Sequence, residues 1–123
     1  MIIKPNTNKV RKAIWISYDF GLRGDYNGLY TWLDNNNALE CGQGLAFLKY
    51  RALKDLDSKE LMKEVLADLK KNVKLSKTDR IYIICKESTT NKIKGDFMNG
   101  GRKAASWEGY GNLSNQGAED EGE

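Results

Sequence analysis

The stretch Ala13-Ile-Trp-Ile-Ser-Tyr-Asp-Phe20 opens a segment that runs to Tyr50 and decides the fold. Its residues are mostly β-branched or aromatic, which favours a strand over a helix. Side chains of a strand alternate between its two faces. The stretch therefore predicts a strand that ends at Asp19, with Trp15 and Ser17 on the same face as that aspartate.

The rest of this segment predicts a helix followed by a return to the sheet. Asp25 stands at a helix-cap position. The apolar stripe that follows at helical spacing consists of Tyr26, Leu29, Tyr30 and Leu33. Residues 38–50 are apolar but are interrupted by Gly42 and Gly44. Because glycine inside a strand pattern marks a bulge or a bend, this part is either two strands with a tight turn or one bent strand.

The second half of the chain repeats the helix and strand pattern. Asp57 and Glu60 have capping-box spacing and begin a second amphipathic helix. Arg80–Lys86 predicts a further strand, and residues 92–98 predict an edge strand whose lysines discourage edge pairing. This order predicts an α+β ferredoxin-like sandwich, an antiparallel sheet with two helices on one face.

The domain boundaries follow from composition. We expect one ferredoxin-like domain over residues 13–111. Residues 1–12 are polar and basic and predict a flexible arm. Residues 112–123 are polar, end in acidic residues and predict a disordered acidic tail.

Composition also excludes several classes of chemistry. The chain has no histidine, so Ser–His and Cys–His catalysis are excluded. Cys41 and Cys85 are far apart inside apolar runs, which predicts reduced, buried thiols in a cytoplasmic protein and argues against a zinc site. No apolar run approaches the ~20 residues that cross a bilayer, so we expect no membrane association.

The charges of the chain are divided unevenly. Its 20 basic and 17 acidic residues give a formal net charge of +3. Four of those acids lie after residue 118, where no base lies, so residues 1–118 carry 20 bases against 13 acids, a charge of +7. This excess suits a nucleic acid, although a solvated lysine-rich surface would give the same composition. The acidic tail either competes for the basic surface or only solubilises the chain.

Candidate nucleic-acid-binding residues fall into two clusters. Phosphates attract cations, and bases stack on aromatic rings. The first cluster runs from the predicted edge strand into the loop after it and comprises Lys92, Lys94, Arg102 and Lys103 with Trp107 and Tyr110. The second lies at the end of the second helix and comprises Lys70, Lys71 and Lys74.

The sheet face that the helices leave uncovered is a candidate interface. Trp15 and Ser17 are predicted to lie there, together with Tyr82 or its neighbour Ile83 according to the register. An exposed aromatic face usually marks an interaction surface. We therefore expect a homodimer, with a nucleic acid or another protein as further possible partners.

Asp19 has two interpretations. It is either a turn-initiating aspartate that accepts hydrogen bonds from nearby backbone amides, or a carboxylate directed at a metal or a partner. In the second case Asp19 from each subunit of a dimer would hold Mg²⁺ or Mn²⁺, with Asp25 and Asp96 as candidate further ligands. Otherwise we expect no cofactor.

Several short motifs resemble known families. Ile16-Ser-Tyr-Asp-Phe20, Gly24-Asp-Tyr26, the return Gly42-Gln-Gly-Leu45 and Asp79-Arg-Ile-Tyr-Ile83 resemble the small SinR-like proteins. More distantly, they are similar to the ferredoxin-like CRISPR-adaptation subunit and the VapD ribonucleases. The resemblance implies a ferredoxin-like fold and dimerisation. It also matches Asp19 to the strand-end aspartate linked in the CRISPR-adaptation and VapD members to metal-dependent cleavage. Gln43 matches a glutamine in the returning strand that serine follows in those families, where this chain has Gly44.

Three function classes follow. The leading hypothesis is a small dimeric binding or accessory module, without catalytic activity, that associates with nucleic acid or acts in a phage or mobile-element context. The second is a divalent-metal-dependent ribonuclease or deoxyribonuclease that uses Asp19 at a dimer interface. The third is a phage or defence-system accessory protein that binds a protein or a nucleotide.

Overall fold

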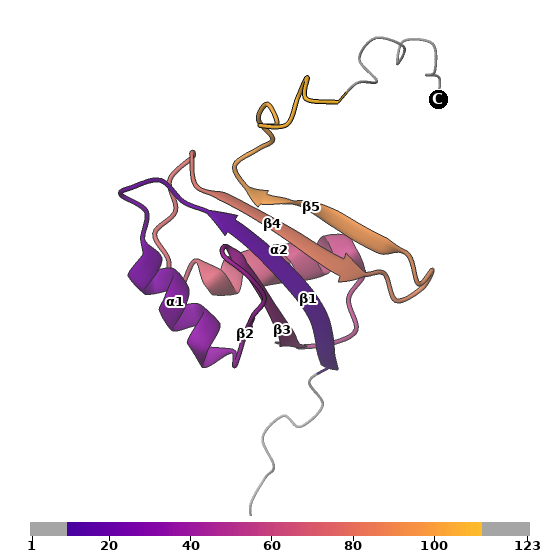
Figure 1. The fold of residues 1–123 in the computed structure, drawn as a ribbon. Coiled ribbons are helices and arrows are strands. Elements are labelled where there is room, and N and C mark those ends of the chain that lie inside the picture. The colour runs from indigo at the N-terminus through magenta and orange to yellow at the C-terminus, as the bar shows by residue number, and fades with distance from the viewer. Residues whose placement is uncertain (1–9, 112–123) are drawn as a thin grey trace, which may run out of the picture.

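Five antiparallel strands form one sheet in the computed structural model, which describes residues 10–111. In chain order the elements are β1 (Val10–Asp19), α1 (Tyr26–Asn35), β2 (Leu39–Glu40), β3 (Leu45–Ala52), α2 (Ser58–Leu69), β4 (Arg80–Lys86) and β5 (Ile93–Asn99). The strands lie side by side in the order β2-β3-β1-β4-β5 (Figure 1). This confirms the α+β architecture. The strand order differs from that of a four-stranded ferredoxin-like sheet, because the additional strand β5 lies at one edge.

The central strand β1 is longer than the sequence pattern predicts. It begins at Val10 rather than at Ala13, because Arg11 and Lys12 pair with Arg51 and Tyr50 of β3. Those residues of the predicted arm therefore belong to the sheet. The remainder of the arm and the predicted acidic tail lie outside the described residues.

The segment from residue 38 to residue 52 forms two strands with a tight turn. Leu39 pairs with Phe47 and Glu40 pairs with Ala46, so β2 and β3 form a hairpin. Gly44 in the turn has a φ of 78°, a left-handed conformation that favours glycine. Its carbonyl oxygen accepts a hydrogen bond of 2.8 Å from the Tyr18 amide, which fixes the turn against β1.

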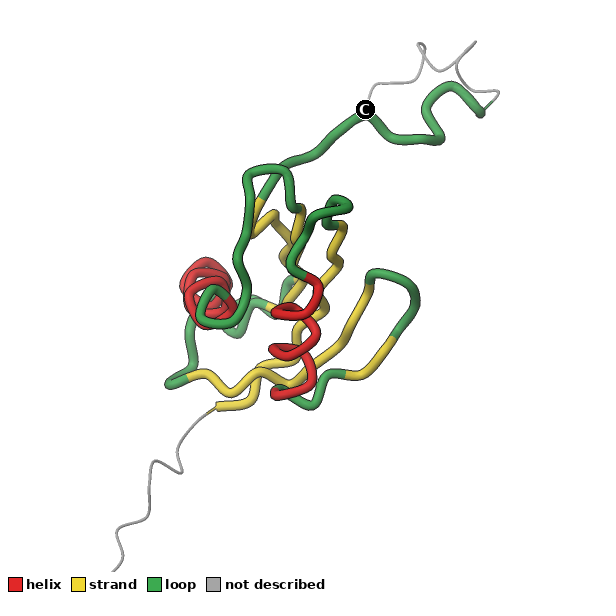
Figure 2. The backbone as a smooth tube through the Cα atoms, turned by 90° about the vertical axis from the view of Figure 1, so that its left-hand side faces the viewer, coloured by secondary structure: helices red, strands yellow, loops and turns green. Residues whose placement is uncertain are grey.

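One face of the sheet and both helices enclose the core. Alternate residues of the three central strands point into it, and Leu29 of α1 and Leu61 of α2 pack among them. Figure 2 shows the two helices beside the sheet layer. The sheet residues that are buried here are Ile14, Ile16, Ala46, Leu48, Tyr50, Ala52, Ile81, Ile83 and Cys85.

Two predictions about burial are wrong. The buried stripe of α1 is Leu29, Trp32 and Leu33, and Tyr30 is 52% exposed. The Trp32 ring enters the core because its Nε1–H donates a 2.9 Å hydrogen bond to Asp68 of α2, which satisfies its polar atom. Cys85 is buried as expected, and burial raises the pKa of its thiol, but Cys41 is exposed in the turn after β2.

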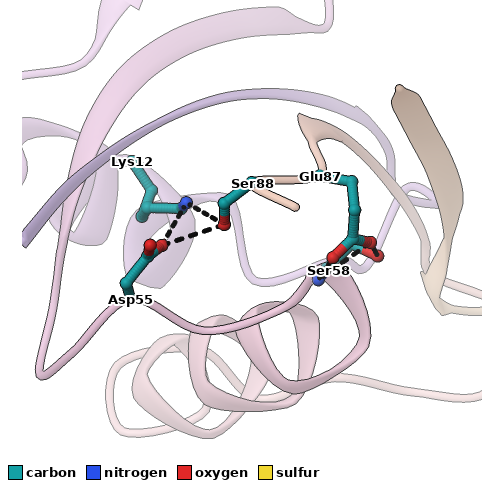
Figure 3. Close-up of polar contacts among 5 residues, drawn as sticks. All are labelled: Lys12, Asp55, Ser58, Glu87 and Ser88. Atoms are coloured by element: carbon teal, nitrogen blue, oxygen red, sulfur yellow. Dashed lines mark hydrogen bonds and ion pairs between the residues drawn. The ribbon is translucent and has the colours of Figure 1, made fainter. Parts of the chain in front are cut away.

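A polar cluster joins the start of α2 to the two central strands (Figure 3). Lys12 forms a 2.8 Å ion pair with Asp55, and the Ser88 hydroxyl donates to the same carboxylate. The buried Glu87 accepts a 2.6 Å hydrogen bond from the Ser58 hydroxyl. The cluster ties β1 and the end of β4 to the loop and helix that follow β3.

No helix within residues 10–111 combines the length and the apolar character that a membrane span requires.

Candidate functional site: the open face of the sheet

The face of the sheet opposite the helices carries an aromatic strip. Residues that pair across antiparallel strands project to the same face, so the registers define its members. Trp15 pairs with Phe47 on one side and Ile84 on the other, and Tyr82 pairs with Ser17 and Phe97. We call this surface the open face, and its rings Trp15, Phe47, Tyr82 and Phe97 the aromatic strip. The register thus places Trp15, Ser17 and Tyr82 on the open face and Ile83 in the core.

The rings of the strip contact one another in two pairs. The centroids of Trp15 and Phe47 are 4.9 Å apart, and so are those of Tyr82 and Phe97. Trp15 is 36% exposed. A Cβ atom on Gly95 would lie 2.7 Å from the Tyr82 hydroxyl oxygen, so glycine at this position lets the Tyr82 ring lie over β5. The strip is therefore an apolar surface that crosses β3, β1, β4 and β5.

Cations lie on both sides of this strip, toward the two ends of the strands. Toward one end of the strands, the outward positions beyond Trp15 and Phe47 hold the cations Arg11, Lys49 and Arg51. These cations and Phe47 line part of a cavity of about 320 Å³. Lys86 of β4 lies at the same end. Arg80, at the other end, lines a cavity of about 340 Å³ with Tyr82 and Phe97. Asp19 is the only carboxylate at the outward positions of the described strands.

The segment after β5 returns one cation to the aromatic strip. The Arg102 guanidinium carbon lies 5.4 Å from the Phe97 ring centroid and 6.0 Å from that of Tyr82. These distances suit a cation–π contact. The Arg102 guanidinium therefore adds a positive charge at the β4–β5 side of the aromatic strip.

Asp19 forms ion pairs instead of capping a turn. Arg80 donates a 2.9 Å hydrogen bond to its Oδ2 atom, and the Lys103 ammonium is 3.9 Å away. The interpretation of Asp19 as an acceptor for backbone amides is therefore wrong. The cross-strand pairing of Asp19 with Arg80 explains this, because it brings the guanidinium alongside the carboxylate.

The other two candidate ligands lie elsewhere. Asp25 accepts hydrogen bonds from the amides of Gly28 and Lys74, and Asp96 accepts one from the Phe97 amide. Within residues 10–111, no three His, Cys, Asp or Glu side chains gather as metal ligands would.

The predicted nucleic-acid-binding residues do not all meet at one surface. Arg102 and Lys103 lie at the open face, as described above. Residues 70–74, which hold Lys70, Lys71 and Lys74, follow α2 in the helix layer. Lys92 lies in the turn before β5, and Lys94 pairs with the buried Cys85 and so faces the helix side. Trp107 and Tyr110 are 75% and 85% exposed on a segment that leads away from the sheet (Figure 1).

Sequence reasoning missed several residues of the open face. The missed members are Phe47 and Phe97 of the strip and the cations Arg11, Lys49, Arg51 and Lys86. The alternation of Leu45, Phe47, Lys49 and Arg51 with buried residues was a usable signal in the sequence.

Comparison with known proteins adds no relative. No family model matches the chain, and no similar protein was found among curated sequences or solved structures. The resemblance to the SinR-like, CRISPR-adaptation and VapD families therefore stays a prediction.

Proposed function

We propose that the protein is a binding module that holds single-stranded nucleic acid on the open face of its sheet. The observation that carries the proposal is the aromatic strip with cations on both of its sides. Bases of a single strand expose their ring faces and stack on aromatic side chains, and each phosphate attracts a nearby cation. A duplex hides its base faces, so an apolar strip of rings favours a single strand.

The charge balance of the face favours a polyanion over a second copy of the same surface. Two open faces packed together would bring Arg11, Lys49 and Arg51 of one copy toward like charges of the other, with only Asp19 among the outward strand positions to offset them. A homodimer through this face is thus an alternative outcome of the binding experiment. In that case light scattering shows a mass of twice 13.9 kDa, and added oligonucleotide does not lower this mass.

We further infer a ferredoxin-like fold with one added strand. The order β2-β3-β1-β4, with helices after β1 and β3, supports this classification, and β5 widens the open face on the β4 side. The added strand contributes Phe97 to the strip. An accessory module fits this face better than a nuclease, because the Asp19 carboxylate that would hold a metal ion accepts a hydrogen bond from Arg80.

The test measures the affinity of the protein for a fluorescent single-stranded oligonucleotide. We expect binding that weakens steeply with salt, because phosphate contacts release counterions. Trp15→Ala should weaken it by about 1–3 kcal/mol, the contribution of a stacked base, and Trp15→Phe should restore most of that loss. Thermal melting of each variant separates lost binding from lost folding.

A matched pair of double variants locates the site. Lys49→Gln with Arg51→Gln removes two charges from the open face, and Lys70→Gln with Lys71→Gln removes two from the end of α2. The first pair should lower both the affinity and the salt dependence, and the second should change them little. Equal losses in both variants, or no binding by the wild type at low salt, would contradict the proposal.

A further inference from the structure

A third cavity continues the open face around the end of β1. It measures about 680 Å³ and shares Ser17, Asp19 and Arg80 with the cavity beside Tyr82 and Phe97. A single strand of nucleic acid that lies on the open face would reach this cavity by passing the Asp19–Arg80 ion pair. The other side chains that define it are Tyr18, Tyr26, Tyr30, Glu40 and Gln43, and we call it the tyrosine cavity.

One wall of the tyrosine cavity is aromatic. The ring centroids of Tyr26 and Tyr30 are 5.6 Å apart, and those of Tyr18 and Tyr30 are 6.5 Å apart. The Tyr26 hydroxyl accepts a hydrogen bond from the Phe20 amide and donates one to the Phe20 carbonyl, which fixes its ring. Tyr30 remains 52% exposed and offers a surface on which a planar ring can stack.

The β2–β3 hairpin supplies a polar side. Glu40 ends β2 and Gln43 lies in the turn, and within residues 10–111 neither side chain forms a hydrogen bond. The backbone that carries them is fixed, because the Cys41 amide donates to the Leu45 carbonyl at 3.0 Å and the Tyr18 amide donates to the Gly44 carbonyl. A carboxylate and an amide are thus held beside aromatic rings with their hydrogen-bonding capacity unused.

This combination suits a base rather than a phosphate. The Glu40 carboxylate repels a phosphate, whereas Arg80, Arg102 and Lys103 beyond the ion pair attract one. A carboxylate accepts two hydrogen bonds best from two adjacent donors. Guanine presents such donors, N1–H and the N2 amino group, while adenine, cytosine and thymine each pair a single donor group with neighbouring acceptors on that edge.

We propose that the tyrosine cavity binds an unpaired guanine of the bound strand. The base stacks on Tyr30, its N1–H and N2 amino group donate to Glu40, and the Gln43 amide donates to its O6 atom. This assignment rests on the proposed binding of single-stranded nucleic acid to the open face, and it adds sequence preference to that function.

The test compares three oligothymidylates of about ten nucleotides, a length that suits a single small domain. One has thymidine throughout, one has a single deoxyguanosine, and one has deoxyinosine, which lacks the N2 amino group, at the same position. We expect the guanine oligonucleotide to bind on the order of tenfold more tightly than the unsubstituted one. Inosine should lose most of that gain, because one of the two donors to Glu40 is missing.

Glu40→Gln should abolish the difference in affinity between the guanine oligonucleotide and the oligothymidylate. Glu60→Gln is the matched control, since it removes one exposed carboxylate from the first turn of α2. Equal binding of all three oligonucleotides by the wild type overturns the guanine cavity and leaves the proposed function standing. Loss of preference in Glu60→Gln as well overturns the specific role of Glu40, and absence of any binding overturns both proposals.

Discussion

Asp19 controls the cations at one end of the open face. Its side chain is 58% exposed, and it holds Arg80 at 2.9 Å and Lys103 at 3.9 Å beside the rings of Tyr82 and Phe97. An exposed ion pair of this kind stabilises a fold by less than about 1 kcal/mol. We therefore expect its main effect to be electrostatic, because it neutralises charge at the place where the proposed function puts a phosphate.

Asp19→Asn should strengthen the binding of single-stranded oligonucleotide, because Arg80 and Lys103 become free to contact phosphates. The melting temperature should change little, since the lost ion pair is exposed. Titration of the labelled oligonucleotide measures the first effect, with Glu60→Gln as the control for net charge.

The same variant tests the nuclease hypothesis. If Asp19 held Mg²⁺ or Mn²⁺, the wild type would cleave RNA or DNA in the presence of that metal and the Asp19→Asn variant would not. Metal-dependent cleavage that disappears in this variant, with weaker instead of stronger binding, would refute the ion-pair role and favour catalysis.

At the scale of elements, the sequence largely predicted the helices and strands. It did not predict the register between neighbouring strands or the contacts that depend on it. The caps Asp25 and Asp57 stand where the sequence predicts, because each accepts a hydrogen bond from an amide in the first turn of its helix. The choice between Tyr82 and Ile83 for the open face depended on register, and a shift of one residue exchanges the two faces. Arg102 was predicted to bind nucleic acid, but its position over Phe97 depends on the path of the chain after β5.

Asp25 connects the two helical segments and gives stability a pH dependence. Its carboxylate accepts 2.9 Å hydrogen bonds from the Lys74 and Gly28 amides, and these bonds lower the pKa of Asp25 below the ordinary 3.8. A lowered pKa contributes stability that is complete above the ordinary value and is lost as the pH falls through the folded-state pKa.

Asp25→Asn should therefore destabilise the protein near neutral pH, and the difference from the wild type should shrink as the pH falls below about 3.8. Urea unfolding at a series of pH values measures this difference. Asp34→Asn, an exposed substitution on the same helix, is the control. A difference that stays constant down to about pH 2 would contradict the role of the ionised carboxylate.

For the whole molecule, the distribution of charge sets how strongly it attracts a polyanion. Residues 1–118 carry a formal charge of +7, and the acids at positions 119–123 reduce it to +3. Because these acids share the sign of a phosphate backbone, we expect them to compete with an oligonucleotide for the same cations.

Deleting residues 112–123 should therefore tighten oligonucleotide binding, most clearly at low salt where charges are screened least. Replacing Glu119, Asp120, Glu121 and Glu123 by their amides should have the same effect at unchanged length. The affinity of both variants at two salt concentrations checks this, and unchanged affinity in both would show that the tail only solubilises the chain.

The position of β1 between β3 and β4 also matters while the chain is being made. β1 leaves the ribosome before β3 and β4, yet its second neighbour comes from Arg80–Lys86. Pairing between segments so distant in sequence is slow to form. A nascent or truncated chain that stops before Arg80 leaves one edge of β1 without its partner strand. It also leaves Ile14 without Cys85 and Ile16 without Ile83 across from them. Chains that stop before Arg80 should therefore fail to fold, whereas chains that extend beyond β4 can close the core.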